Sequence, residues 1–282
     1  MQPAKSWAFP AIIFSVAGCN SPTQHFDQEA IRLGLPSEVY RGSEFVHTVY
    51  RRDKLRGPSS PRSLHIYLGS DGTPMQAGGP AVDPTPRDPL ALRLLALDPE
   101  PAIYLGRPCY HGLARLPGCS SKFWTTARYS EEVVGSLEAA VRRFKAENGL
   151  ERISWFGYSG GGTLAMLLAE RFSETQSVVT VAANLDVEAW TEHLGYGRLT
   201  YSLNPAARPT LPERVVQRHY VGALDRVVPV DITARALAGK SDKLIVIEHY
   251  DHVCCWEQIW PKVLAELAQA IHVSESDQRS AR

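Results

Sequence analysis

The sequence has no excess of charge of either sign and no long apolar run beyond its first twenty residues. Lys plus Arg and Asp plus Glu both number 30 among the 282 residues, so the formal net charge is zero. Nucleic-acid-binding domains carry a basic surplus, so its absence leads us to expect no nucleic-acid partner. Because 44% of the residues are hydrophobic, the chain can still bury a full core.

Cysteines are few, and their spacing does not favour a metal site. None of the 5 cysteines belongs to a C-x-x-C pair, so we expect no metal. Cys109 and Cys119 lie in one loop, and we expect a local disulfide between them. The adjacent Cys254 and Cys255 rarely bridge each other without strain, so one of them could instead reach the 109–119 loop. The sequence alone leaves this pairing open.

The amino terminus has the pattern of an exported protein. Lys5 precedes an apolar stretch at residues 7–17, which is too short to span a bilayer and fits the core of a signal peptide. Residues 16–19, Val-Ala-Gly-Cys, resemble a bacterial lipobox, in which the cysteine becomes the lipidated first residue. The resemblance implies a signal peptide at residues 1–18 and an acyl anchor on Cys19. The protein would then be anchored to a membrane of the cell envelope, in the periplasm or at the outer membrane. The alternatives are a plain secretory signal or a short buried segment.

Strand and helix patterns alternate along the rest of the chain. Seven short, mostly apolar runs predict strands, at residues 45–50, 64–68, 102–105, 153–156, 177–182, 215–220 and 244–247. Helical periodicity lies between them, for example at Val133, Leu137 and Val141. This alternation predicts an α/β fold in which helices cover both faces of a mostly parallel central sheet.

One domain accounts for most of the sequence. We assign it to residues 43–273, after an anchor or linker at residues 19–42 and before a polar, flexible tail at residues 274–282. Residues 185–212 contain three prolines and predict a small insert, which we place after the sixth strand of the fold. Among the seven runs listed above, it follows the one at residues 177–182. This insert is too short to be a domain of its own and could serve as a lid.

The most informative motif is Gly-Tyr-Ser-Gly-Gly at residues 157–161. It follows the predicted strand at residues 153–156 and precedes a run of good helix formers, so Ser159 lies at a strand–turn–helix junction. In this context a G-x-S-x-G pattern indicates a nucleophile. Glycine at positions 157 and 161 lets the strand and the helix approach closely. The alternative is that Ser159 only caps the helix.

A nucleophilic serine needs a histidine base and a carboxylate that orients the base. The expected chain order for such a junction is Ser, then Asp or Glu, then His. Asp225 lies in a turn after a predicted strand, and His252 lies in the loop before the last helix. We therefore predict a catalytic triad of Ser159, Asp225 and His252. Asp186 is the alternative acid, and His249 is the alternative base.

An oxyanion hole needs two backbone N–H donors that point at the developing negative charge. We assign one to Gly160, the residue after the nucleophile. The other is expected in the loop at residues 69–74, where we assign it to Asp71, with Ser70 as the alternative.

These motifs resemble those of bacterial α/β-hydrolase-fold serine hydrolases of the lipoprotein type. The resemblance rests on residues 157–162, residues 222–229 and His252 with Trp256, and it extends over residues 45–270. Residues 107–110, Arg-Pro-Cys-Tyr, also resemble the loop that follows the fourth strand in this group. It implies an esterase- or lipase-like enzyme that cleaves a small-molecule carboxylic ester through an acyl-enzyme, without a metal or organic cofactor. One departure is that residues 69–72 lack the His-Gly pair common in lipases and esterases.

Two other functions stay open at this point. The same triad serves peptidases, amidases and acyltransferases, and a fold does not determine its substrate. From another class of protein, a non-catalytic envelope lipoprotein could keep the fold as a binding module. The natural substrate, the preference for esters or amides, the mobility of the insert and the oligomeric state are not determined by the sequence.

Overall fold

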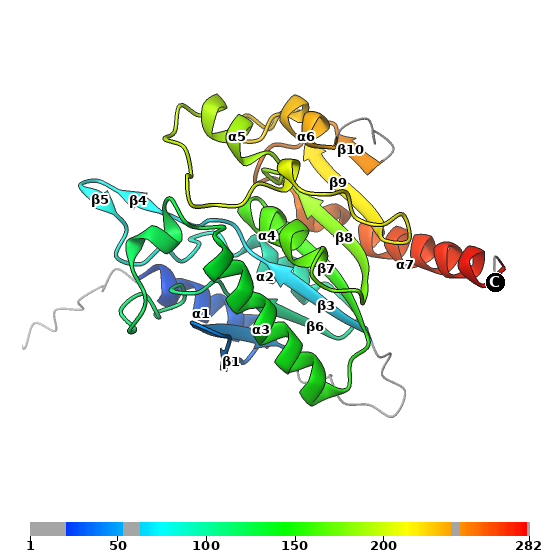
Figure 1. Cartoon of the computed structure of the whole chain (residues 1–282), viewed down its shortest axis with the longest axis horizontal. Helices are drawn as coiled ribbons and strands as arrows, with labels where there is room; N and C mark the ends of the chain where they lie inside the picture. The colour runs from blue at the N-terminus through cyan, green and yellow to red at the C-terminus, as the bar shows by residue number, and fades with distance from the viewer. Residues whose placement is uncertain (1–20, 53–62, 238–242, 281–282) are drawn as a thin grey trace, which may run out of the picture.

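An eight-stranded sheet forms the centre of the structure (Figure 1). The structure is a computed structural model that describes residues 21–52, 63–237 and 243–280. The strands lie in the order β1-β2-β6-β3-β7-β8-β9-β10. Their bounds are β1 (Ser37–Arg41), β2 (Val46–Arg51), β3 (Ser63–Leu68), β6 (Ala102–Leu105), β7 (Arg152–Tyr158), β8 (Thr175–Val181), β9 (Val216–Gly222) and β10 (Leu244–Ile247). A two-stranded hairpin of β4 (Met75–Gln76) and β5 (Gly79–Pro80) follows β3.

The sheet is mostly parallel, as the sequence predicts. Strand β2 is antiparallel to both of its neighbours, β1 and β6. All other neighbouring pairs in this sheet are parallel. All four residues of β6 and six of the seven in β7 are buried, because helices cover both faces of the sheet.

Two layers of helices enclose the sheet. Helices α3 and α4 pack on one face, and α1, α2 and α7 pack on the other (Figure 1). Trp190 of α5 and Ile232 of α6 belong to a separate small buried cluster together with Val228. The helix bounds are α1 (Pro22–Arg32), α2 (Leu90–Ala96), α3 (Glu131–Asn148), α4 (Gly160–Ala169), α5 (Val187–His193), α6 (Val230–Ala236) and α7 (Trp256–Ser280).

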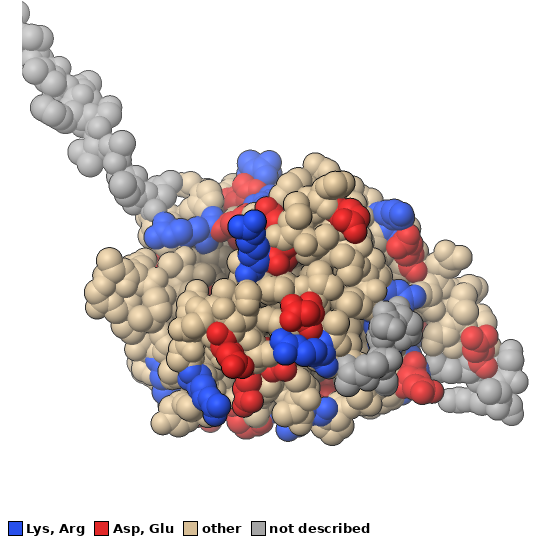
Figure 2. Space-filling view, turned by 90° about the horizontal axis from the view of Figure 1, so that it is seen from above, with Lys and Arg blue, Asp and Glu red and all other residues tan. Residues whose placement is uncertain are grey.

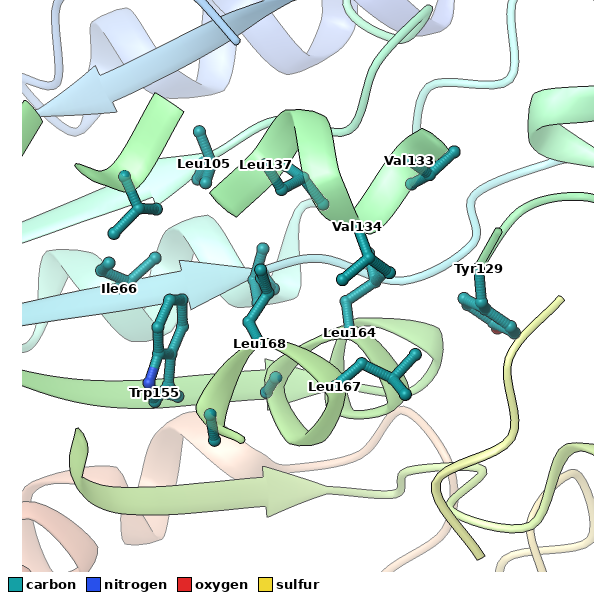
Figure 3. Packing of buried hydrophobic residues seen from close by; sticks show 14 of the residues in the cluster. Ile66, Leu105, Tyr129, Val133, Val134, Leu137, Trp155, Leu164, Leu167 and Leu168 are labelled. Atoms are coloured by element: carbon teal, nitrogen blue, oxygen red, sulfur yellow. The ribbon is translucent and has the colours of Figure 1, made fainter. Parts of the chain in front are cut away.

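Alternate residues of each strand face opposite helix layers, as the pleat of a strand requires. In β3, Ile66 packs in the core beneath α3 and α4, whereas Tyr67 packs with α1, α2 and α7. Figure 3 shows Ile66 and Trp155 of the sheet lying against Leu168 of α4. Leu164, one turn earlier in α4, is also fully buried. Each such side chain contributes about 1.5–3 kcal/mol of burial free energy, so this layer fixes α4 firmly on the sheet.

The fold begins earlier in the chain than the sequence predicts. The segment assigned to an anchor or linker, residues 19–42, contains helix α1 and strand β1. Phe26 of α1 is fully buried, with its ring centroid 5.2 Å from that of Tyr104 and 4.5 Å from that of His111. The linker prediction is therefore wrong for this segment. Only three of the eleven residues in α1 are buried, so its mostly polar sequence conceals a helix that belongs to the core.

The other predicted boundaries have mixed outcomes. The insert after the sixth strand of the sheet is confirmed: residues 185–212 lie between β8 and β9 and contain α5 and a 3-10 turn, η3 (Pro205–Ala207). The prediction of a flexible tail is wrong for residues 274–280, because α7 continues to Ser280.

The predicted signal peptide at residues 1–18 and the lipidation site at Cys19 lie outside the described residues. Within the described ranges, no helix combines the length and the apolar character needed to cross a bilayer.

Both pairs of cysteines in the folded domain are bonded. Cys109 and Cys119 form the predicted disulfide in the loop after β6, with their Cα atoms 5.6 Å apart. Cys254 and Cys255 are bonded to each other. The alternative in which one of these two reaches the 109–119 loop is therefore wrong.

Charges of both signs are mixed on the surface. On the face shown in Figure 2, basic and acidic side chains lie next to each other without forming a large area of one sign. Ion pairs such as Arg208 with Glu170, at 2.7 Å, account for part of this mixing. Exposed pairs of this kind contribute little to stability, at most about 1 kcal/mol each.

Replacing Phe26 tests whether α1 is part of the core. We expect Phe26→Ala to lower the free energy of unfolding by about 3–5 kcal/mol, because it leaves a cavity among buried aromatic rings. Urea denaturation followed by tryptophan fluorescence measures the change. The matched control is Ile31→Ala on the same helix, since Ile31 is 78% exposed and its loss should cost about 0.5 kcal/mol or less. Equally small effects from both variants would contradict a structural role for α1.

Candidate active site

Ser159 lies in the sharp turn between β7 and α4. Its backbone has φ 52° and ψ −125°, a conformation that residues with a side chain seldom adopt. Two hydrogen bonds hold the turn: the Ser159 N–H donates to the Val181 carbonyl at 2.9 Å, and the Gly162 N–H donates to the Ser159 carbonyl at 2.9 Å. Ser159 itself is 9% exposed. Strained backbone of this kind is concentrated at functional sites, where surrounding structure maintains it.

Glycines make this turn sterically possible. A Cβ atom on Gly157 would lie 2.4 Å from the Gly161 carbonyl oxygen. A Cβ on Gly161 would lie 2.0 Å from the Leu68 carbonyl oxygen, and one on Gly162 would lie 2.3 Å from the Ala183 Cβ. All three distances are shorter than real contacts allow. As the sequence predicts, glycine at positions 157 and 161 therefore allows strand and helix to approach closely.

The structure brings Ser159, Asp225 and His252 together. The His252 Nδ1 lies 2.9 Å from the Asp225 Oδ2, and the His252 Nε2 lies 3.1 Å from the Ser159 Oγ. Because a carboxylate only accepts hydrogen bonds, Nδ1 carries the proton in this arrangement. Nε2 of the neutral ring is then free to accept the hydrogen bond from the Ser159 hydroxyl. These two contacts form one continuous line from the carboxylate to the hydroxyl.

Asp225 is fixed by its own turn after β9. Its side chain is fully buried, and its Oδ1 accepts hydrogen bonds from the backbone N–H groups of Val227 and Val228, both at 2.8 Å. The other carboxylate oxygen is thereby left to face His252. The turn also touches the histidine loop, because the Leu224 N–H donates to the Tyr250 carbonyl at 2.9 Å.

His252 is held at its backbone and accessible at its ring. Its carbonyl accepts hydrogen bonds from the Tyr158 hydroxyl at 3.2 Å and from the Trp256 indole N–H at 3.3 Å. Its side chain remains 15% exposed. The imidazole is therefore not sealed inside the core, in contrast to the fully buried Asp225 side chain.

The alternative acid and base lie elsewhere. Asp186 caps helix α5 by accepting from the Ala189 N–H at 3.1 Å, and it also accepts from the Asn204 side chain at 3.1 Å. His249 occupies a backbone position with φ 62° after β10. The histidine that contacts both the Ser159 hydroxyl and the Asp225 carboxylate is His252.

The loop after β3 lies against the beginning of α4, as the oxyanion-hole prediction requires. A Cβ atom on Gly160 would lie 2.0 Å from the Asp71 Oδ1. Gly160 and Asp71, the two residues predicted to supply N–H donors, are therefore neighbours beside Ser159. That their N–H groups bind an oxyanion stays a prediction.

The side chain of Asp71 has a role that sequence reasoning missed. Its Oδ1 lies 2.7 Å from the Arg107 Nη2, and its Oδ2 lies 2.9 Å from the Arg128 Nη1. The Tyr129 hydroxyl donates to the same carboxylate at 2.6 Å, and the Tyr110 hydroxyl donates to the Asp71 carbonyl at 2.9 Å. Asp71 is thus held by four side chains from the segment between β6 and α3.

The charge state of Asp71 follows from these contacts. Burial by itself raises the pKa of the Asp71 carboxyl, but the guanidinium groups of Arg107 and Arg128 outweigh burial and hold the pKa below its usual value. Asp71 is therefore a carboxylate at neutral pH. Residues 107–110 stood out in the sequence only through their resemblance to a hydrolase loop, and Arg128 had no motif signal at all.

Neither a group of metal ligands nor the cavity described next coincides with the Ser159 site in the described residues. Within the described ranges, no group of three or more His, Cys, Asp or Glu side chains is placed to hold a metal. A cavity of about 550 Å³ is lined by Ser63, Arg152 and Gln176 together with α7. These residues lie at the amino-terminal ends of β3, β7 and β8, at the edge of the sheet opposite Ser159.

Comparison with known proteins identifies the fold. No protein-family model matches the chain. No curated protein matches it in sequence. Solved structures do match: an α/β serine hydrolase without a lid from Xanthomonas campestris has a TM-score of 0.53 and 11% identity, covering 84% of this chain and 94% of that one.

Two further structures agree with this result. A putative lipase from Acinetobacter baumannii has a TM-score of 0.55 and 14% identity, covering 92% of this chain and 98% of that one. An esterase of Pyrococcus furiosus has a TM-score of 0.56 and 11% identity, covering 86% of this chain and 92% of that one. The chain therefore has the α/β-hydrolase fold, as the sequence predicts. At these identities the likeness establishes the fold alone.

Adding one methyl group at Gly161 tests the packing of the turn at Ser159. We expect Gly161→Ala to be destabilised by at least 2 kcal/mol, roughly the cost of overpacking, because its Cβ would collide with the Leu68 carbonyl at 2.0 Å. Thermal unfolding followed by circular dichroism measures the effect. In the matched control Gly135→Ala in α3, the nearest atom to the new Cβ is at 3.9 Å, so about 0.5–1 kcal/mol of added helix stability is expected. If Gly161→Ala were as stable as the wild type, the close approach described here would be wrong.

Proposed function

We propose that this protein is a serine hydrolase that cleaves a carboxylic ester through an acyl-enzyme. The observation that carries the proposal is the line of hydrogen bonds from Asp225 through His252 to Ser159, at 2.9 and 3.1 Å. These three groups come from three separate loops, and their order along the chain matches the order expected for this fold. A serine that only caps a helix would not require an imidazole hydrogen-bonded to its hydroxyl and to a buried carboxylate.

The proposed reaction begins at the Ser159 hydroxyl. Its Oγ attacks the ester carbonyl carbon while His252 Nε2 takes the hydroxyl proton. Asp225 holds the proton on Nδ1 and stabilises the imidazolium that forms. The carbonyl oxygen becomes an oxyanion, and the N–H groups of Gly160 and Asp71 are proposed to bind it.

The second half of the reaction reverses these roles. His252 gives its proton to the leaving alcohol as the carbon–oxygen bond breaks, which leaves the acyl group on Ser159. A water molecule then loses a proton to His252 and attacks the acyl-enzyme. The acid is released, and Ser159 recovers its proton. All proton transfers in this scheme involve His252, so no metal or organic cofactor is required.

We also propose that the enzyme is exported and attached to a membrane of the cell envelope. The support is the signal-like apolar stretch at residues 7–17 and the lipobox resemblance at Cys19. The disulfide between Cys109 and Cys119 fits an oxidising compartment outside the cytoplasm. Mass spectrometry of the protein from a membrane fraction would show an acylated cysteine at the amino terminus, whereas a mature chain without lipid would contradict the anchor.

The principal test replaces the nucleophile. We expect Ser159→Ala to abolish labelling by a fluorophosphonate probe and to lower kcat for p-nitrophenyl butyrate by about 10³-fold or more. In the control Ser173→Ala, the lost hydroxyl belongs to an exposed residue and donates to Glu174 at 3.0 Å, so labelling and turnover should not change. Retained labelling in Ser159→Ala would reject the assignment. A panel of peptides beside the ester would reveal a peptidase with the same triad.

Replacing the acid tests the orientation of His252. We expect Asp225→Asn to lower kcat by about 10³- to 10⁴-fold, because the amide can donate to Nδ1 and thereby favour the wrong tautomer. Asp186→Asn is the matched control, since Asp186 serves as a helix cap, and a change of less than about tenfold is expected. Initial rates with p-nitrophenyl butyrate measure both. A larger loss of kcat in Asp186→Asn than in Asp225→Asn would indicate that Asp186, and not Asp225, orients His252.

A further inference from the structure

A buried cluster of charge lies beside the proposed nucleophile. It consists of Asp71, Arg107 and Arg128, and we call it the two-arginine cluster. The Asp71 carboxylate lies 2.7 Å from one guanidinium and 2.9 Å from the other. Only 3% of the Arg107 side chain and 9% of the Arg128 side chain are exposed. Arginine is rarely buried to this extent unless each charge is paired.

The charges in this cluster do not cancel. Two guanidinium groups face one carboxylate, which leaves one positive charge in excess. Besides Asp71, the groups that act most strongly on both guanidinium groups are the hydroxyls of Tyr110 and Tyr129, which are neutral. Burying a positive charge without a counter-charge raises the free energy of the folded protein. An excess positive charge at this position therefore favours the binding of an anion there.

The two-arginine cluster lies close to residues that contact the proposed triad. The Asp71 Oδ1 would lie 2.0 Å from a Cβ on Gly160, the residue that follows Ser159. On the other side, the Arg128 guanidinium lies 6.0 Å from the centre of the Trp190 ring in α5. Trp190 packs in turn with Val228, whose N–H binds Asp225. Arg128 therefore lies between Asp71, in the loop after β3, and Trp190, which packs with Val228 of the turn that holds Asp225.

Within the part of the chain that the structure describes, several donors in and beside this cluster have no acceptor. Arg128 donates through Nε to the Thr125 carbonyl and through Nη1 to Asp71, both at 2.8–2.9 Å, which leaves Nη2 available. Among the described residues, the indole N–H of Trp190 and the Nε and Nη1 of Arg107 are buried without a hydrogen-bond partner. Unsatisfied buried donors next to an excess positive charge are the features of a site for a negatively charged acceptor.

We propose that Arg128, supported by the two-arginine cluster, binds an anionic group of the substrate, so that the enzyme prefers esters that carry a carboxylate near the scissile bond. The inference rests on the proposed ester hydrolysis at Ser159. A carboxylate on the Arg128 Nη2 would bring the net charge of the cluster to zero and accept a charge-assisted hydrogen bond. Arg107 is more deeply buried and supplies the excess charge without contacting the substrate.

Matched pairs of esters test the preference in the wild-type protein. One pair places the charge in the acyl part, with mono-p-nitrophenyl adipate against p-nitrophenyl hexanoate. The other places it in the alcohol part, with 4-acetoxybenzoate against p-tolyl acetate. The ratio of kcat/KM within each pair is divided by the ratio of the hydroxide-catalysed rates. We expect the anionic ester to be favoured by about 10-fold or more in one pair, the effect of one hydrogen bond between charged groups.

Replacing Arg128 tests which residue causes the preference. We expect Arg128→Gln to reduce the corrected ratio of kcat/KM for the anionic ester over the neutral ester by about 10- to 100-fold. Arg128→Lys should reduce this ratio less, since lysine keeps the positive charge but lacks the planar guanidinium group. The matched control is Arg208→Gln, which removes an exposed arginine paired with Glu170 and should leave both rates unchanged. Melting temperatures confirm that each variant is folded.

The outcomes separate this inference from the proposed function. An equal loss on neutral and anionic esters in Arg128→Gln would overturn the inference, since it indicates a purely structural arginine. If the wild-type enzyme showed equal corrected kcat/KM for the neutral and the anionic ester in both pairs, the inference about Arg128 would be overturned. The proposed ester hydrolysis would not be affected by that result. Failure to cleave any ester, together with no fluorophosphonate labelling, would instead reject the proposed function.

Discussion

The site depends on one steric constraint, which is the close approach of the backbone around Ser159 to the loop after β3. Gly161 faces the Leu68 carbonyl with no room for a Cβ, and Gly160 faces the Asp71 carboxylate in the same way. This contact keeps Ser159 at φ 52° and places the loop of the proposed oxyanion donors beside it. The buried leucines of α4 hold the helix in this position, so core packing maintains the strain at the turn.

The parallel arrangement of the strands brings the other groups to the same edge. Since β7, β9 and β10 run in one direction, the segments that follow them meet at their carboxyl ends. Ser159, Asp225 and His252 follow these three strands in turn. The Asp71–Arg107–Arg128 contacts add a second set of side chains to this edge, from the loops after β3 and β6. The position of each charged group is therefore set by the end of a strand or by a hydrogen bond to the backbone.

The sequence was sufficient for the elements that carry a local signal. The strand–turn–helix context identified the position of Ser159, and chain order then selected Asp225 and His252, which the structure places within hydrogen-bond distance. Helix α1 escaped prediction because only Pro22, Phe26 and Ala30 turn inward, too few for a clear apolar stripe. The contacts of Arg128 also escaped, since a buried arginine looks like any surface arginine until its partners, distant in sequence, are known.

The start of α1 has a consequence for how the domain would sit on a membrane. Ser21 caps the helix, and the Thr23 N–H binds Asp83 at 3.0 Å in a segment that touches Gly72 beside Asp71. An acyl chain on Cys19 would be separated from Ser21 by Asn20 alone, a tether of about 7 Å when fully extended. If Cys19 carries the proposed acyl chain, so short a tether prevents free tumbling of the domain and keeps the loop next to Ser159 close to the lipid headgroups.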